Sequence, residues 1–217
     1  MSVASEVILV HGLWYGPMAM SFLARQLEDD GFRVRKFSYP ATATHVAQHA
    51  EKLLAFIRRG AAARSHLVGH SLGGLVIVKA LAVDHDSDSQ ALPQLNGARV
   101  VLLGTPLRGS AVAQKVMQLP GGQSLFRKAA EDLCEGQPYL PEQRRIGLIA
   151  GSRSFGLGRL LGQSAEGSDG TVALDETESP GLAARLILPV SHTGMLFSRR
   201  VARQTAIFLR TGQFSDG

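Results

Sequence analysis

Residues 65–81 read SHLVGHSLGGLVIVKAL, a stretch that places Ser71 between two glycines where an apolar strand pattern gives way to a helical one. A serine on a tight strand-to-helix turn is held in a strained conformation that exposes its hydroxyl, and the flanking glycines avoid collisions across the turn. The following helix directs free N–H groups and its positive dipole end toward the turn. The stretch therefore predicts a nucleophilic serine at the start of a helix.

Apolar strand patterns alternate with helical patterns along the rest of the chain. This alternation is typical of a mainly parallel sheet with helices on both faces, so we expect a single α/β domain over residues 1–217. The helical patterns cover residues 17–29, 45–59, 72–83 and 195–210, and the strand patterns cover residues 7–10, 32–37, 65–70, 100–103, 146–150 and 186–190.

Residues 105–144, between the fourth and fifth predicted strands, lack a strand pattern. They contain two short amphipathic pieces, 110–119 and 124–133, and we predict a small helical cap inserted into the domain. Periodicity alone does not separate a cap over a pocket beside Ser71 from helices that pack on the sheet. The residues that we expect to line a substrate pocket are Trp14, Leu107, Met117, Leu119 and Phe126.

The composition of the chain bounds its class. Of 217 residues, 45% are hydrophobic, which suits one sizeable core. The formal net charge of +5 comes from scattered basic residues, so we expect no nucleic-acid partner and at most weak contact with an anionic membrane surface. The apolar run Val7–Val10 is too short for a signal peptide or a membrane span, and the one cysteine, Cys134, cannot form an intramolecular disulfide. We therefore expect a cytoplasmic protein.

A serine hydroxyl becomes a nucleophile when a histidine accepts its proton and a carboxylate orients that histidine. In sheets of this type the order along the chain is serine, acid, histidine. His192 follows the last strand pattern, in LILPVSHTGML, and is the predicted base. Asp169 is the preferred acid because Gly167 and Gly170 allow a tight turn around it, and Asp175 is the alternative.

Two backbone N–H donors are needed to stabilise the negative charge that develops on a substrate carbonyl oxygen. Leu72, the residue after the serine, supplies one, and the loop in VILVHGLW supplies the other, with Leu13 as the candidate and Trp14 as the alternative. The histidine pair in HVAQH, at His45 and His49, lacks the glutamate of a zinc protease motif. We therefore predict no metal site.

Five motifs occur in the order VHGLW, GHSLGG, LLGTPLRGS, SDGTV and SHTGML. With them, residues 10–196 resemble the α/β-hydrolases of the bacterial lipase and esterase type. The resemblance implies an α/β-hydrolase fold and cofactor-free hydrolysis of carboxylic esters. It also implies a triad of Ser71, Asp169 and His192, with Leu13 and Leu72 as oxyanion donors.

The predicted cap is shorter than the large lids of many lipases. We therefore expect a small-molecule ester or lipid substrate with a short to medium acyl chain. Thioesterases, amidases, lactonases and non-catalytic small-molecule binders on the same fold remain alternatives.

Overall fold

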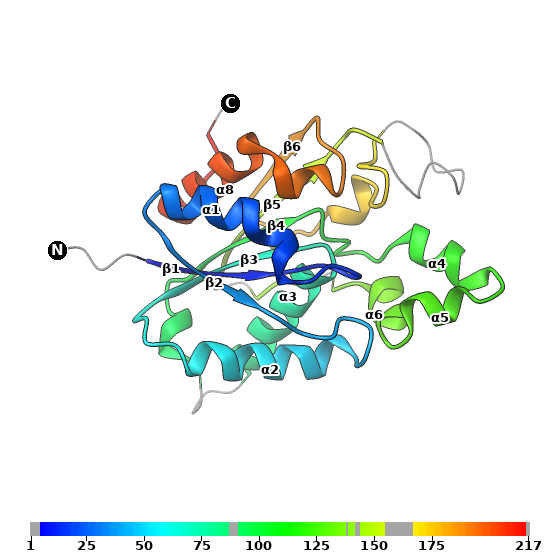
Figure 1. Cartoon of the computed structure of the whole chain (residues 1–217), viewed down its shortest axis with the longest axis horizontal. Helices are drawn as coiled ribbons and strands as arrows, with labels where there is room; N and C mark the ends of the chain where they lie inside the picture. Colours follow the sequence, from blue (N-terminus) through cyan, green and yellow to red (C-terminus); the bar gives the residue numbers. More distant parts are fainter. Residues whose placement is uncertain (1–4, 87–90, 138, 142–143, 155–166, 216–217) are drawn as a thin grey trace.

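The computed structural model describes residues 5–86, 91–137, 139–141, 144–154 and 167–215. At its centre lies a six-stranded sheet in the order β2-β1-β3-β4-β5-β6, and every neighbouring pair of strands is parallel (Figure 1). The carboxyl ends of the strands therefore meet at one edge of the sheet. The strands are β1 (Glu6–Val10), β2 (Arg33–Phe37), β3 (Ser65–His70), β4 (Arg99–Leu103), β5 (Arg145–Gly151) and β6 (Ala184–Leu188).

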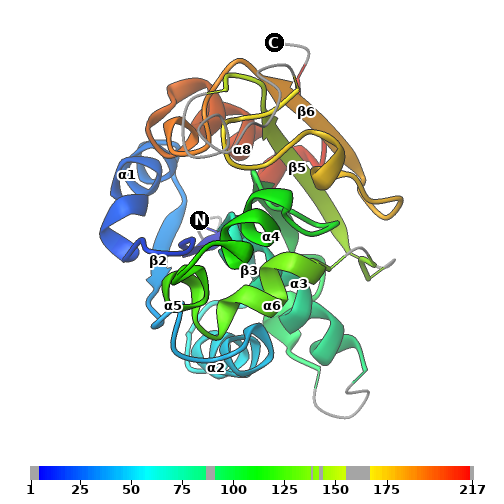
Figure 2. The same ribbon diagram turned by 90° about the vertical axis from the view of Figure 1, so that its right-hand side faces the viewer.

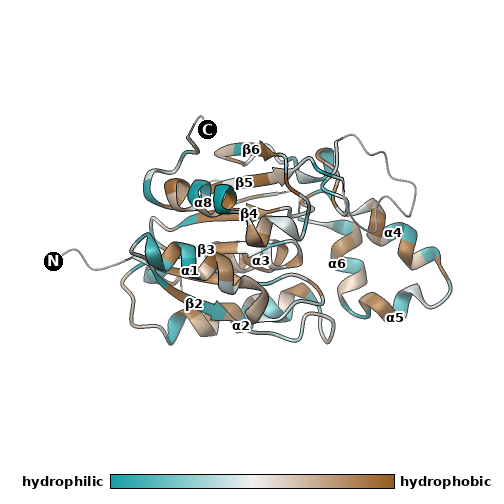
Figure 3. Ribbon diagram, turned by 45° about the horizontal axis from the view of Figure 1, so that its top comes forward, coloured by the Kyte–Doolittle hydropathy of each residue, from teal (hydrophilic) through white to brown (hydrophobic). Residues whose placement is uncertain are grey.

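Helices cover both faces of the sheet. On one face lie α1 (Ser21–Asp29) and α8 (Arg199–Thr211), and on the other lie α2 (Val46–Arg58) and α3 (Leu72–His85) (Figure 1). Each face has its own apolar core, because central strands of a parallel sheet are buried on both sides. Figure 3 shows this arrangement as brown central strands beside α8, whose outer side is teal. The predicted fold class, a mainly parallel sheet between two helical layers, is confirmed.

The helix boundaries follow local capping chemistry. The predicted last helix is divided, because Ser198 accepts a hydrogen bond from the Val201 N–H and starts α8 after a short 3₁₀ helix, Gly194–Phe197. The first helical pattern likewise begins as a 3₁₀ helix, Pro17–Met20, before α1. Strand β6 ends at Leu188, two residues before its predicted end, because the next residue is a proline, which has no N–H for the sheet.

Three short helices, α4 (Ala111–Gln118), α5 (Gly122–Phe126) and α6 (Ala129–Glu135), lie beyond the carboxyl ends of the strands (Figure 1). Figure 2, which faces this edge, shows them in front of the sheet. The sequence pattern predicted two helical pieces, but the second is divided at Arg127, whose φ of 50° takes the chain out of a right-handed helix. We call residues 111–135 the cap.

Candidate active site

The turn between β3 and α3 holds Ser71 in a strained conformation. Its φ of 53° and ψ of −123° are rare for a residue with a side chain. A Cβ atom on Gly73 would lie 2.3 Å from the Val10 carbonyl oxygen, and one on Gly69 would lie 2.7 Å from the backbone of α3. Glycine is therefore required at position 73, where β1 passes close, and at position 69, where the backbone of α3 passes close. The Ser71 N–H donates to the Leu103 carbonyl at 2.9 Å, which fixes the turn to β4.

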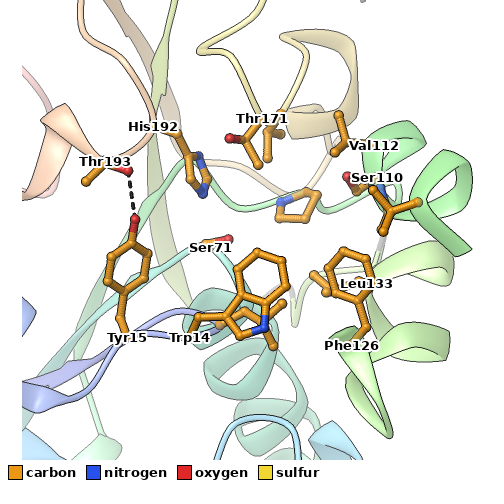
Figure 4. A pocket seen from close by; sticks show the side chains of 15 residues that line it. Trp14, Tyr15, Ser71, Ser110, Val112, Phe126, Leu133, Thr171, His192 and Thr193 are labelled. Carbon is orange, nitrogen blue, oxygen red and sulfur yellow. Dashed lines mark hydrogen bonds between the residues drawn. The ribbon is translucent and has the colours of Figure 1, made fainter. Parts of the chain in front are cut away.

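A buried histidine and carboxylate lie next to this turn. Nδ1 of His192 is 2.7 Å from Oδ2 of Asp169, and the His192 N–H donates to the Asp169 carbonyl at 3.0 Å. Because an ionised carboxylate only accepts hydrogen bonds, this contact favours a proton on Nδ1 and leaves Nε2 free to accept one. His192 and Ser71 line the same cavity and lie near each other on its wall (Figure 4).

The loop around Asp169 explains why this carboxylate, and not that of Asp175, meets the histidine. Oδ1 of Asp169 accepts the N–H groups of Thr171 at 2.9 Å and Val172 at 2.7 Å, so Oδ2 points away from the loop. Gly167 and Gly170 in this loop have φ values of 77° and 94°, as the predicted tight turn requires. Asp175 lies exposed at the start of a 3₁₀ helix, where its carboxylate accepts the next backbone N–H.

The loop after β1 brings Leu13 to the cavity wall. The Tyr39 hydroxyl donates to the His11 carbonyl at 2.8 Å, and the two rings stack with centroids 4.5 Å apart. Burial lowers the pKa of His11, so its neutral ring supports the loop. Leu72 is the first residue of α3, where a backbone N–H has no acceptor within the helix. The loop and the helix thus place both predicted oxyanion donors beside Ser71, and their catalytic role stays a prediction.

An apolar cavity of about 220 Å³ opens beside Ser71 and His192 (Figure 4). Trp14 and Phe126, which the sequence analysis placed in a substrate pocket, both line it. Thr171 and Val172, from the loop that carries Asp169, form another part of the cavity wall. The cap residues that line the cavity are Val112, Ala113, Val116, Phe126 and Leu133, and Ser110, which accepts a hydrogen bond at the start of α4, lines it beside them.

Three residues predicted for the pocket are not among the described residues that line it. Leu107 is fully buried in the core, Met117 packs partly buried against that core, and Leu119 is half exposed at the end of α4. Helical phase explains the position of Met117, because α4 directs Val116 inward and the next residue falls on another side of the helix. Leu119 follows the last residue of α4, where the backbone is extended and the side chain is half exposed.

The fold agrees with a comparison of the sequence against known families. A sequence profile described as the alpha/beta hydrolase family matches residues 7–206. The chain belongs to this family. Among proteins with curated descriptions, no sequence match is found.

Solved structures with the fold of this hydrolase include three enzymes. The mature form of lipase BlEst2 from Bacillus licheniformis has a TM-score of 0.74 at 19% identity, covering 98% of this chain and 93% of the lipase. A metagenomic carboxyl esterase has a TM-score of 0.66 at 17% identity, covering 97% and 76%. An Arabidopsis methylesterase has a TM-score of 0.58 at 16% identity, covering 96% and 98%. At these identities the likeness shows the fold, and the predicted α/β-hydrolase fold is confirmed.

His70 and Tyr15 contact the loop of this hydrolase that carries His192. Nε2 of His70 is 3.1 Å from the His192 carbonyl oxygen, and burial lowers the pKa of His70 to about 3, so its neutral ring donates this bond. The ring of Tyr15 packs edge-on against His70, and its hydroxyl lies 2.7 Å from Oγ1 of Thr193 (Figure 4). Sequence reasoning missed Tyr15 and Thr193, because a contact across 178 positions leaves no local pattern.

Sequence reasoning also missed Glu176, a buried carboxylate that joins the acid loop to the cap. Its Oε1 accepts the N–H of Ala111, the first residue of α4, at 2.6 Å, and its Oε2 accepts the N–H of Ala173 at 2.9 Å. Burial raises the pKa of Glu176, while the two N–H donors favour its charged form. Since a negative charge at a helix N-terminus is stabilising, Glu176 fastens α4 to the loop that carries Asp169.

Within the described ranges, no group of three or more His, Cys, Asp or Glu side chains is arranged to hold a metal ion. None of the helices described there combines the length and the apolar character needed to cross a membrane.

Proposed function

We propose that this hydrolase cleaves carboxylic esters through an acyl-enzyme on Ser71. The observation that carries the proposal is the buried 2.7 Å contact between His192 Nδ1 and Asp169 Oδ2, at an apolar cavity that Ser71 also lines. A reactive serine with a supported base at the end of an apolar cavity suits a substrate with a carbonyl group and a hydrocarbon chain.

In this mechanism, Nε2 of His192 takes the proton from Ser71 while Oγ bonds to the ester carbonyl carbon. The carbonyl oxygen becomes an oxyanion, which the N–H groups of Leu13 and Leu72 stabilise. Asp169 stabilises the imidazolium that has formed. The carbon–oxygen bond to the alcohol then breaks, the alcohol takes the proton from His192, and the acyl group stays on Ser71.

A water molecule completes the cycle. His192 takes one of its protons while the water oxygen attacks the acyl carbon, and collapse of the second tetrahedral intermediate returns a proton to Ser71 and releases the carboxylic acid. Each half-reaction uses the same three side chains and the same two backbone donors.

The cavity supports a substrate with a short to medium acyl chain. Each buried methylene contributes about 0.8 kcal/mol, and the gain ends when the cavity of about 220 Å³ is full. Ester chemistry is further supported by the solved structures named above, which are of a lipase, a carboxyl esterase and a methylesterase. A cytoplasmic location and weak contact with an anionic membrane surface remain predictions from the sequence.

Labelling with a fluorophosphonate tests the proposal. The purified protein should form one covalent adduct, and peptide mass spectrometry should place it on Ser71. Ser71→Ala should not be labelled and should lose p-nitrophenyl butyrate hydrolysis by roughly 10³-fold or more, because the triad acts as a unit.

The matched control is Ser110→Ala, which removes another hydroxyl from the wall of the same cavity and should still be labelled. Circular dichroism and thermal melting should show that both variants fold. Labelling at another residue, or near-normal turnover by a folded Ser71→Ala variant, would contradict the proposal.

A further inference from the structure

Trp14, the one tryptophan of the chain, has a strained backbone conformation and is more than half exposed. This combination is unusual for a bulky residue. Its φ is 59°, a left-handed conformation that bulky residues rarely adopt, and 55% of the residue is exposed. A residue is kept in such a conformation only where its surroundings hold it there, and such residues cluster at functional sites. Trp14 directly follows Leu13, the predicted oxyanion donor, so its position invites a functional explanation.

The indole of Trp14 reaches from the loop after β1 to the cap. Its Nε1–H donates to the Leu125 carbonyl oxygen at 3.0 Å, and its ring stacks on Phe126 with centroids 5.2 Å apart and planes inclined by 26°. Leu125 and Phe126 are the last two residues of α5. Trp14 and Phe126 both line the cavity beside Ser71, so the stacked pair forms part of its wall (Figure 4).

The part of the cap that Trp14 holds differs from its neighbours. Glu176 fastens the start of α4, and Asp132 of α6 accepts the N–H of Val46 at 3.0 Å, which fastens α6 to the start of α2. The helix between them, α5, is flanked by two residues with positive φ, Gly121 at 78° and Arg127 at 50°. These flanks make α5 a separate short unit within the cap. The indole of Trp14 joins this unit to the loop after β1, which also carries Leu13.

We propose that Trp14 sets the upper limit of acyl-chain length, because its indole, bonded to Leu125 and stacked on Phe126, closes the outer side of the acyl cavity. This inference rests on the proposed ester hydrolysis at Ser71. An acyl chain that grows from Ser71 between the cap helices gains about fourfold in kcat/KM per buried methylene until it reaches the indole. A longer chain must displace the ring and break both contacts with α5.

The test compares kcat/KM for soluble p-nitrophenyl esters from acetate to laurate in the wild-type protein, Trp14→Ala, Trp14→Gly and Trp14→Phe. We expect the laurate-to-butyrate ratio to rise on the order of tenfold in the alanine and glycine variants, since the wall is removed. The phenylalanine variant keeps a ring for the stack but lacks the N–H donor, so its ratio should rise less. Phe197→Ala, which removes an aromatic residue that is 57% exposed and does not line the cavity, should leave the ratio unchanged.

The melting temperatures of the variants distinguish a role of Trp14 in limiting acyl-chain length from a role in stabilising the fold. Glycine adopts positive φ without steric penalty, so Trp14→Gly should melt at the same temperature as Trp14→Ala or higher, while both variants shift the ratio. A ratio within twofold of wild type in both variants, or an equal loss for all esters, would overturn the inference while the proposed function stands. A wild-type protein that neither hydrolyses any ester nor reacts with a fluorophosphonate would overturn both.

Discussion

The two sides of the cavity are held in different ways. On the side that carries the proposed triad, which we call the catalytic side, Ser71, Asp169 and His192 are at most 8% exposed, and contacts of 2.7 to 3.0 Å fix each of them to a neighbouring loop or strand. On the outer side, Trp14 and Leu125 are each more than half exposed, and the indole is held by a hydrogen bond to a carbonyl and a ring stack. The catalytic side is thus fixed by contacts with the sheet and its loops, whereas the outer side is fixed by the contacts between Trp14 and α5.

This difference matches two separate requirements of an enzyme. Reacting groups lose rate when they are displaced by a fraction of an ångström, so they belong among the most stable parts of the fold. A wall that meets substrates of different size has to yield, and such segments come from the less stable parts of a structure. Substitutions on the catalytic side should therefore lower kcat, and substitutions on the outer side should change which ester is preferred.

After the loss of Ser71 itself, the largest effect should come from the carboxylate of the catalytic side. Asp169→Asn should lower kcat for p-nitrophenyl butyrate by roughly 10²- to 10⁴-fold, because an amide no longer stabilises the imidazolium or fixes the ring proton on Nδ1. Asp175→Asn is the matched control, and its exposed side chain should change kcat by less than about twofold. If the two variants exchanged these values, Asp175 would be the acid.

A smaller effect is expected at His70, which touches the histidine loop. His70→Phe removes the donor to the His192 carbonyl and should lower kcat by roughly tenfold to a hundredfold with little change in KM. His70→Gln restores an N–H donor and should recover part of this loss. Phe126→Ala, on the outer side, should alter KM for longer esters instead, because this ring lines the cavity and stacks on Trp14. A His70→Phe variant with normal kcat would show that the loop needs no support from this side.

The smallest effect should be the response of folding stability to acid. The pKa of His70 is lowered to about 3 by burial, whereas an unfolded chain protonates it near its usual value of 6.5. The unfolded state therefore binds the proton first, so stability is highest above pH 6.5 and falls as the pH decreases toward 3. Urea unfolding at pH 7 and pH 5 should show an acid loss smaller by about 1–2 kcal/mol in His70→Phe than in wild type.

Trp14→Phe, on the outer side, is the control for this measurement and should keep the acid response of the wild-type protein. His49 and His66, whose pKa values burial lowers to about 4, remain in all three proteins and contribute equally. An unchanged acid loss in His70→Phe would mean that protonation of this ring does not limit the stability of the catalytic side.

The catalytic side could be predicted from the sequence because each of its residues follows a strand. Ser71 follows β3, Asp169 lies between β5 and β6 along the chain, and His192 comes four residues after the end of β6. Strand patterns are local, and in a parallel sheet the carboxyl ends of all strands meet at one edge. Knowing the strands was therefore enough to bring these three residues together.

The outer side could be predicted only in part, because Trp14 and Phe126 were assigned to the pocket but the contact between them was not. The division of the cap at Arg127 and the positive φ of Trp14 depend on contacts that form only after folding. The direction of Leu107 into the core depends on how the chain turns after β4, which no periodicity encodes. Short helices show too few turns for a clear apolar face, so the sequence did not resolve which side of α4 Met117 occupies or that this helix ends before Leu119.

With Ser71 and His192 in their proposed roles, the strand order also bears on when the protein becomes reactive during folding. The proposed nucleophile follows a strand in the middle of the sheet, whereas the loop that carries the proposed base follows β6, the last of the described strands, which lies at an edge of the sheet. Parallel strands joined by helices pair through distant segments, and such pairings form slowly. A chain that has assembled only β1 to β4 already contains the serine turn but has no base to activate it. On this proposal, reactivity at Ser71 would report on the completed native state, because a chain in which β6 has not docked lacks the positioned base.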